Sequence, residues 1–330
     1  PGPRPPPLPA MTAPAARPRP LKPPRLRPGD TIGLVCPASA PVAPERLHAG
    51  AAALAARGHP VKLGRHVLAR HGAFAGTDAQ RAEDLNTMLA DPEVRMIIAV
   101  RGGYGCPRIL ADVDYHAVRR DPKIVVGYSD LTALQLALFA RTGLVTFSGP
   151  MAGVEFRQGL DPFTAEHFWR LVTHPAPPGE LPNPADEPRA TLVDGTGEGP
   201  LLGGCLSLLA SGLGTPYLPD LRGAVLALED IHEHLHRVDR LLTQLRHAGI
   251  LGSLAGLALG HFTDCGPADP SPPWLDLPAI LDEVIRPSGV PTLTGLAYGH
   301  VPRKLTLPWG VPARLDATAR RLELLEGAVA

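Results

Sequence analysis

A buried strand that turns directly into a buried helix is the feature that most constrains this chain. Residues 123–128 form a short apolar strand pattern, and residues 131–141 form an apolar helix pattern. Only Ser129 and Asp130 separate them, so the chain must turn sharply at the start of a helix. Free N–H groups and the helix dipole favour negative charge there. The turn therefore suits either a simple helix cap or a serine nucleophile whose intermediate carries an oxyanion.

Strands and helices alternate through the first half of the chain. The sequence predicts strands at residues 31–36, 60–63, 94–100 and 124–126, and helices near residues 45–57, 80–89 and 131–141 and from residue 107. This alternation predicts a parallel sheet covered by helices on both faces. Such sheets bind ligands at the carboxyl ends of their strands, which is where the turn at residues 127–130 lies.

The length and the proline distribution predict two α/β domains. The chain has 330 residues, which is ample for two cores. We expect a disordered proline-rich tail at residues 1–26 and an N-terminal Rossmann-like domain at residues 27–165. A proline-rich, polar linker is expected at residues 166–190, followed by a C-terminal α/β domain at residues 191–330.

Charge and cysteine content exclude several classes of protein. Lys and Arg number 32 and Asp and Glu number 32, so the formal net charge is zero. That balance argues against nucleic acid or an acidic membrane surface as a partner. No apolar run is long enough to cross a bilayer. The four cysteines are widely spaced and form no C-x-x-C pair, which disfavours a disulfide framework or a zinc ribbon and favours a reducing cytoplasm.

A carboxylate and a histidine in the second half lie at predicted strand ends. Glu229 ends the apolar segment at residues 223–229, and His300 follows the segment at residues 290–299. Taken singly, Glu229 suits a solvated strand edge or a helix cap, and His300 suits a structural role. Taken with Ser129, they supply the nucleophile, the base and the carboxylate that hydrolysis by a serine triad needs.

Two further motifs have competing interpretations. The loop at residues 101–105 (Arg-Gly-Gly-Tyr-Gly) lacks the G-x-G-x-x-G spacing of a dinucleotide site. Its glycines suit either an oxyanion hole or a tight turn with positive φ. The stretch at residues 232–236 matches H-E-x-x-H, so His232, His236 and Glu233 suggest a zinc peptidase. Its place directly after a strand, with no third histidine downstream, favours a surface turn.

These segments, in this order, resemble the LD-carboxypeptidase family, serine peptidase family S66. The resemblance covers most of residues 27–320, and its motifs are Pro28-Gly-Asp30, Arg81-Ala-Glu-Asp-Leu-Asn86, Arg101-Gly-Gly-Tyr-Gly105, residues 123–134, Gly149-Pro-Met151, Leu228-Glu-Asp-Ile231, Val238-Asp-Arg240, Gly260-His-Phe-Thr-Asp-Cys265 and Gly299-His300.

The resemblance implies a site between two domains. It places the triad on Ser129, Glu229 and His300, with Glu233 as a second candidate for the acid. The backbone amides of Asp130 and Gly103 would form the oxyanion hole. No cofactor or metal is implied. The family includes cytoplasmic homodimers, and the implied reaction is release of D-alanine from a murein tetrapeptide during peptidoglycan recycling.

The sequence leaves other substrates and other functions open. The family also includes microcin C immunity peptidases, so a peptidyl nucleotide is the second substrate class. A zinc peptidase and a non-catalytic peptide binder are the alternatives of other kinds. Three positions depart from the family pattern. This chain has Cys205 where the family often has Asn, His236 where it often has Tyr, and Ser148 where it often has His. None is a member of the implied triad, but all three bear on substrate contacts.

Overall fold

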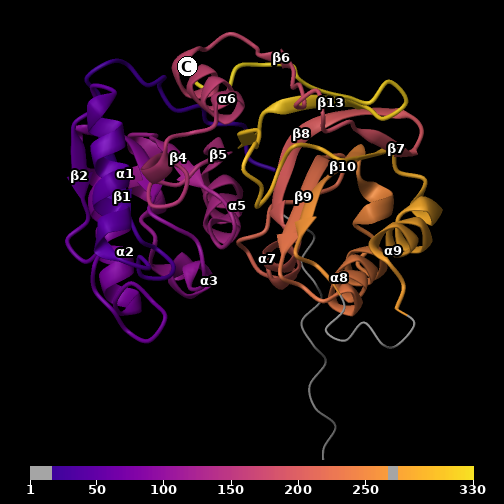
Figure 1. Cartoon of the computed structure of the whole chain (residues 1–330), viewed down its shortest axis with the longest axis horizontal. Coiled ribbons are helices and arrows are strands. Elements are labelled where there is room, and N and C mark those ends of the chain that lie inside the picture. Colours follow the sequence, from indigo (N-terminus) through magenta and orange to yellow (C-terminus); the bar gives the residue numbers. More distant parts are fainter. Residues whose placement is uncertain (1–16, 267–273) are drawn as a thin grey trace, which may run out of the picture.

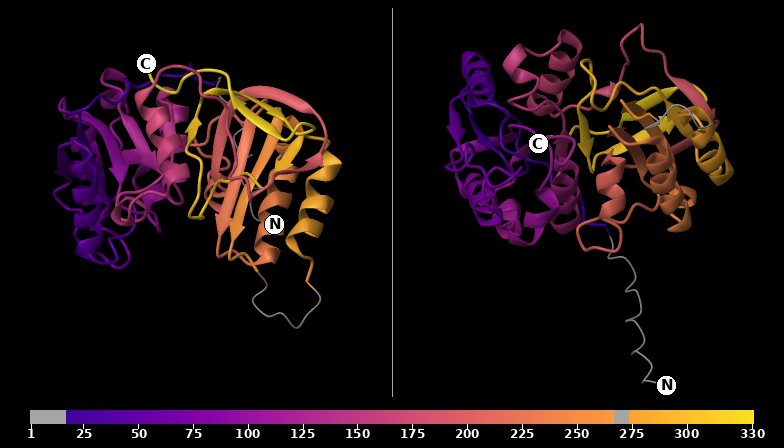
Figure 2. Two further views of the ribbon diagram at one scale, coloured as in Figure 1. Left: turned by 45° about the horizontal axis from the view of Figure 1, so that its top comes forward. Right: turned by 60° about the horizontal axis from the view of Figure 1, so that its bottom comes forward.

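The computed structural model describes residues 17–266 and 274–330 as two sheets lying side by side, each with its own helices (Figure 1). The N-terminal half forms one body and the C-terminal half forms the other, which confirms the predicted two-domain α/β fold. The two bodies remain side by side from two further directions (Figure 2). Residues 1–16 of the predicted tail lie outside the described residues.

The first sheet has six strands in the order β12-β5-β4-β3-β1-β2. Its parallel strands are β1 (Thr31–Val35), β2 (Val61–Leu63), β3 (Val94–Ala99), β4 (Ile124–Gly127) and β5 (Thr146–Ser148). They alternate with α1 (Pro44–Ala56), α2 (Asp78–Ala90), α3 (Cys106–Ile109), α4 (Tyr115–Arg120) and α5 (Leu131–Thr142). The strands predicted in this half are confirmed within one or two residues. Strands β1, β3 and β4 are buried apolar runs next to clear helix signals, whereas the short edge strand β2 is partly exposed.

The second sheet has eight strands in the order β6-β14-β13-β8-β9-β10-β11-β7. Its parallel centre is β8 (Thr196–Cys205), β9 (Val225–Ile231), β10 (Gly256–Thr263) and β11 (Thr292–Thr294). The antiparallel flanks are β6 (Gly179–Glu180), β7 (Ala190–Val193), β13 (Pro312–Asp316) and β14 (Arg321–Leu324). Its helices are α7 (Leu206–Ser211), α8 (Leu235–His247) and α9 (Leu277–Val284).

The chain crosses back to join the two bodies. Strand β12 (Leu307–Trp309) comes from the C-terminal half but pairs antiparallel with β5 of the first sheet. The Trp309 side chain is fully buried, and its Nε1–H donates to Gln135 Oε1 of α5 at 3.2 Å. Nearby, the Cys205 amide donates to Thr132 Oγ1 at 3.0 Å. These contacts fix one half of the molecule against the other.

Segments predicted to be tail and linker also pack against the bodies. Leu21 pairs with Leu144 in an isolated bridge, and Leu26 is buried, because both are apolar residues in an otherwise proline-rich stretch. The segment at residues 166–190 begins inside α6 (Pro162–Thr173) and includes β6. No helix within the described ranges is long and apolar enough to cross a membrane.

Replacing Trp309 tests the connection between the two bodies. Trp309→Ala removes a fully buried ring and leaves the amide oxygen of Gln135 without its donor. We expect the free energy of unfolding, measured by urea denaturation, to fall by about 3–5 kcal/mol. The exposed Leu63→Ala variant is the control, and we expect it to change by less than about 0.5 kcal/mol. Equal losses in the two variants would contradict the role given to β12.

Candidate active site

Ser129 occupies a strained position between β4 and α5. Its φ is +64°, a left-handed conformation that residues other than glycine rarely adopt. The turn is held from behind by Gln135, whose Nε2 donates to the carbonyls of Gly127 and Phe147 at 2.8 Å each. Strain of this kind costs about 1–3 kcal/mol and persists only where the surroundings enforce it. The serine is therefore held at the end of a strand by its surroundings, with its side chain partly exposed.

The glycine loop approaches this serine closely. A Cβ atom added to Gly102 would lie 2.9 Å from Ser129 Cβ and 3.0 Å from its Oγ. Gly103 has a φ of +112°, and a Cβ there would lie 2.4 Å from Ser39 Oγ. Among the hydrogen bonds of the described residues, none uses the amide of Gly103 or of Asp130. Both amides are free to donate to a ligand beside Ser129, as the predicted oxyanion hole requires.

Asp130 connects the turn to the glycine loop. Its carboxylate makes no cap on α5, so the simple cap interpretation of this turn is wrong for that helix. Asp130 Oδ2 instead accepts from the Cys106 amide at 2.7 Å, at the first residue of α3. Burial raises the pKa of Asp130, and the bond from Cys106 opposes that rise. The residue after the serine therefore fixes the loop that faces the serine.

Glu229 and His300 form a buried pair on the second body. Glu229 lies in β9 with no solvent exposure, and His300 Nδ1 is 2.7 Å from its Oε2. Gly299 permits this approach, because its φ is +120° and a Cβ there would lie 3.0 Å from the Glu229 side chain. An Nδ1–H that donates to the carboxylate leaves Nε2 as the acceptor. Glu229 thereby sets the orientation and the tautomer of the imidazole.

Tyr128 places this pair beside the serine. The Tyr128 and His300 ring centroids are 4.9 Å apart in an edge arrangement, and Tyr128 directly precedes Ser129. Within residues 17–266 and 274–330, Ser129 Oγ and His300 form no direct hydrogen bond. Such bonds are often long in the absence of substrate and tighten when it binds. The structure thus brings Ser129, Glu229 and His300 to the boundary between the two bodies. This boundary, where Tyr128 meets His300, is called the seam below.

An ion pair across the seam supports Tyr128, and sequence reasoning missed it. Lys304 Nζ lies 2.6 Å from Glu155 Oε1, and the Tyr128 hydroxyl donates to the same oxygen at 2.7 Å. Lys304 Nζ is also 3.9 Å from the centroid of the Tyr128 ring. The Lys304 and Glu155 side chains are only 4% and 14% exposed. No local pattern marks this pair, because 149 residues separate its members.

The histidine-rich stretch does not form a helical zinc motif. His232 precedes α8 and has a φ of +58°, whereas His236 lies inside that helix, so they do not share one helical face. Glu233 pairs with Arg237 Nε at 2.7 Å rather than with a histidine. Within the described ranges, no group of three or more His, Cys, Asp or Glu side chains could hold a metal ion. The geometry favours the surface turn, and Glu229 over Glu233 as the acid.

Two of the positions that depart from the family pattern, Cys205 and Ser148, lie near residues of the candidate site, and the third, His236, lies near the beginning of α8. The Cys205 thiol donates to Asp230 Oδ1 at 3.2 Å, and burial raises its pKa. The Ser148 hydroxyl is 2.8 Å from that of Tyr298, two residues before His300. His236 stacks on His234, with ring centroids 5.6 Å apart. Each side chain is thus engaged by neighbouring residues rather than left free.

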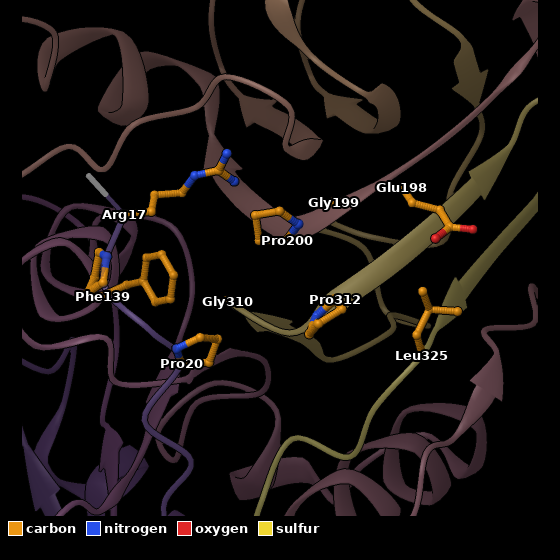
Figure 3. A pocket seen from close by; sticks show the side chains of 10 residues that line it. Arg17, Pro20, Phe139, Glu198, Gly199, Pro200, Gly310, Pro312 and Leu325 are labelled. Atoms are coloured by element: carbon orange, nitrogen blue, oxygen red, sulfur yellow. The ribbon is translucent and has the colours of Figure 1, made fainter. Parts of the chain in front are cut away.

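A hollow of about 470 Å³ lies elsewhere on the seam (Figure 3). Its lining includes Arg17, Phe139, Pro312 and residues 198–200 at the beginning of β8. Glu229 of β9 instead lies opposite Cys205 in the strand register, at the other end of β8. Seven residues of extended strand separate the two ends by roughly 23 Å. The hollow is therefore not part of the candidate active site.

The ion pair across the seam can be tested by a double-mutant cycle. Lys304→Met leaves the Glu155 carboxylate buried without its cation, so we expect the free energy of unfolding to fall by about 3–5 kcal/mol. Adding Glu155→Gln should recover part of that loss, with a coupling of about 1–3 kcal/mol. The exposed pair Arg314 and Glu198, treated likewise, should show a coupling below about 1 kcal/mol. Additive losses at Lys304 and Glu155 would show that they do not act together.

Comparisons with known proteins identify the family of this chain. Residues 32–149 match the LD-carboxypeptidase N-terminal domain, and residues 198–315 match the LD-carboxypeptidase C-terminal domain. The chain is 39% identical over 313 residues to a probable murein peptide carboxypeptidase of Bacillus subtilis, covering 93% of this chain and 95% of that protein.

Two solved structures extend the comparison to the fold. Muramoyltetrapeptide carboxypeptidase from Oxalobacter formigenes is 36% identical, with a TM-score of 0.77, covering 89% of this chain and 97% of the other. MccF in complex with glutamyl sulfamoyl guanosine is 27% identical, with a TM-score of 0.85, covering 94% and 100%. The matched domains span both bodies and include Ser129, Glu229 and His300. The chain therefore belongs to the LD-carboxypeptidase family, serine peptidase family S66.

Proposed function

We propose that this chain is a serine carboxypeptidase that releases the terminal D-alanine of a murein tetrapeptide. The bond cut is the amide between the third residue, at its L-configured centre, and that D-alanine. Membership of the LD-carboxypeptidase family supports the reaction class. The relative named probable murein peptide carboxypeptidase and the muramoyltetrapeptide carboxypeptidase structure support the substrate class.

The proposed reaction passes through an acyl-serine intermediate. His300 Nε2 takes the proton of Ser129 while Oγ bonds to the scissile carbonyl carbon. The amides of Asp130 and Gly103 hold the resulting oxyanion. The C–N bond then breaks, and His300 returns the proton to the amine of the departing D-alanine. His300 Nε2 next takes a proton from water as the water oxygen bonds to the acyl carbon, and it returns that proton to Ser129 Oγ as the ester C–O bond breaks.

The observation that carries this proposal is the Glu229–His300 pair beside the strained serine. Glu229 is fully buried. Its second carboxylate oxygen, Oε1, accepts no hydrogen bond from the described part of the chain. A lone buried carboxylate is costly unless a cation forms next to it. Proton transfer from Ser129 would place that cation on His300, 2.7 Å away. The pair therefore favours the charge separation that the first step creates.

A peptidyl nucleotide is the second candidate substrate. The TM-score of 0.85 to MccF bound to glutamyl sulfamoyl guanosine favours it. The same serine, histidine and glutamate would cut an amide with a different leaving group. We also propose a cytoplasmic setting, peptidoglycan recycling and a homodimer. The unpaired thiols of Cys36, Cys106, Cys205 and Cys265 agree with a reducing compartment.

Release of D-alanine from purified murein tetrapeptide tests the function. We expect Ser129→Ala and His300→Ala each to lower kcat/KM by at least about 10⁴-fold, with little further loss in the double variant, because the two residues act as a unit. Ser288→Ala, at a site remote from the seam, should retain full activity. A chelator should have no effect on the wild-type rate.

Each other outcome points to a different function. Release abolished by the chelator would move the chemistry to the histidine-rich stretch. Release that survives Ser129→Ala would exclude the acyl-serine route. No release from the tetrapeptide, together with cleavage of a peptidyl adenylate, would favour the second substrate. Binding without cleavage of either peptide would indicate a non-catalytic binder.

A further inference from the structure

A carboxypeptidase must accommodate a negative charge close to its nucleophile. The residue that leaves carries the terminal carboxylate, only about one residue spacing (~3.8 Å) from the bond that is cut. Taking that carboxylate out of water is costly unless a cation or several donors receive it. If the proposed function holds, a basic side chain must therefore lie near Ser129 and the glycine loop.

Most basic residues near the seam are already engaged. Lys304 is nearly buried and pairs with Glu155 at 2.6 Å. Arg81 is buried and pairs with Asp78, and its Nη1 donates to the Gly105 carbonyl at 2.9 Å. Arg303 pairs with two carboxylates in turn, those of Asp186 and Glu187. None of these three cations is available for an incoming carboxylate without breaking an ion pair.

Arg108 is engaged as well. Its Nε and Nη2 both donate to the Asp78 carboxylate, at distances of 2.7–3.0 Å, in a two-pronged pair. This pairing matches the planar fork of the guanidinium and is the strongest form of the interaction. It holds Arg108 to the first residue of α2.

Arg101 is different from these residues. It is partly buried, and among residues 17–266 and 274–330 its side chain makes one hydrogen bond, from Nη1 to the Ala40 carbonyl at a long 3.3 Å. The described ranges contain no carboxylate paired with it. A guanidinium has five donors in a fixed fork that matches a carboxylate. Arg101 thus keeps most of its binding capacity unused.

Arg101 is also in a suitable place to bind a carboxylate beside Ser129. Its neighbour Gly102 lies so close to Ser129 that a Cβ atom at residue 102 would be 3.0 Å from Ser129 Oγ. Its Nη2 lies 3.5 Å from where a Cβ of Gly103 would stand, so the guanidinium sits beside the proposed oxyanion donor. The hydrogen bond from Arg101 Nη1 to the Ala40 carbonyl places the guanidinium against the loop that follows β1. The carboxyl ends of parallel strands are where such folds bind ligands.

We infer that Arg101 binds the terminal carboxylate of the peptide and so restricts cleavage to the last residue of a free-acid chain. This inference rests on the proposed function and adds the group that selects the substrate. Arg101 would hold the leaving D-alanine by its carboxylate while the Gly103 amide holds the carbonyl oxygen. Both ends of the scissile amide would then be fixed by one short loop.

A pair of substrates tests the role of Arg101. Murein tetrapeptide with a free carboxylate is compared with the same peptide ending in a carboxamide, with D-alanine and D-alaninamide measured by mass spectrometry. Wild type, Arg101→Gln and Arg101→Lys are assayed. Arg70→Gln is the matched control, because Arg70 also donates to a carbonyl of the same β1–α1 loop, that of Pro41 at 2.9 Å, but belongs to another segment.

We expect wild type to prefer the free acid by at least about 30-fold, as a charge-assisted pair implies. Arg101→Gln should lose that preference by slowing only the free-acid reaction, mainly through KM. Arg101→Lys should keep part of it, and Arg70→Gln should keep all of it. An unchanged carboxamide rate in Arg101→Gln would show that the site is still folded.

The inference and the proposed function can fail separately. Equal losses on the two substrates in Arg101→Gln, or a wild type without preference, would overturn the role of Arg101 while D-alanine release stands. A wild type that cleaves neither peptide would overturn the proposed function and this inference with it.

Discussion

The hydrogen bond between Glu229 and His300 is the interaction on which the proposed site depends. It lies on the second body, whereas Ser129 lies on the first, so neither body alone contains a triad. The 4.9 Å contact between the Tyr128 and His300 rings brings the two parts together. Any hydrolysis by this route therefore requires the two bodies to keep a fixed relative position.

Several contacts maintain that position, and they are unlike one another. Strand β12 completes the first sheet with residues from the second half, and Trp309 donates to Gln135 behind the serine turn. Gln135 in turn holds the carbonyl of Gly127. On the other side of Tyr128, Lys304 and Glu155 place opposite charges across the seam in a nearly buried setting. A buried pair of this kind adds little net stability, but separating it is costly, so it resists relative movement of the bodies.

The sequence predicted the sheet of the first half well because its signals are local. Residues 94–99 and 124–127 are apolar runs that become buried strands, and the helix at residues 78–90 begins with a capping box at Thr77. The prediction that Glu229 and His300 meet followed from family order rather than from any short pattern. Lys304, Glu155 and the role of Asp130 at α3 were missed, because each depends on contacts between distant segments. Strand β12 was missed for the same reason: three residues carry no periodicity, and their partner lies in the other half.

The most direct measurement is covalent labelling of the intact protein with a fluorophosphonate probe, followed by peptide mapping. A triad with Ser129 as its nucleophile predicts one label per chain, located on Ser129. Labelling should slow greatly in His300→Ala and Glu229→Gln, because the serine then lacks its oriented base. A label on another residue, or an equal rate in His300→Ala, would contradict the triad and with it the role given to the seam.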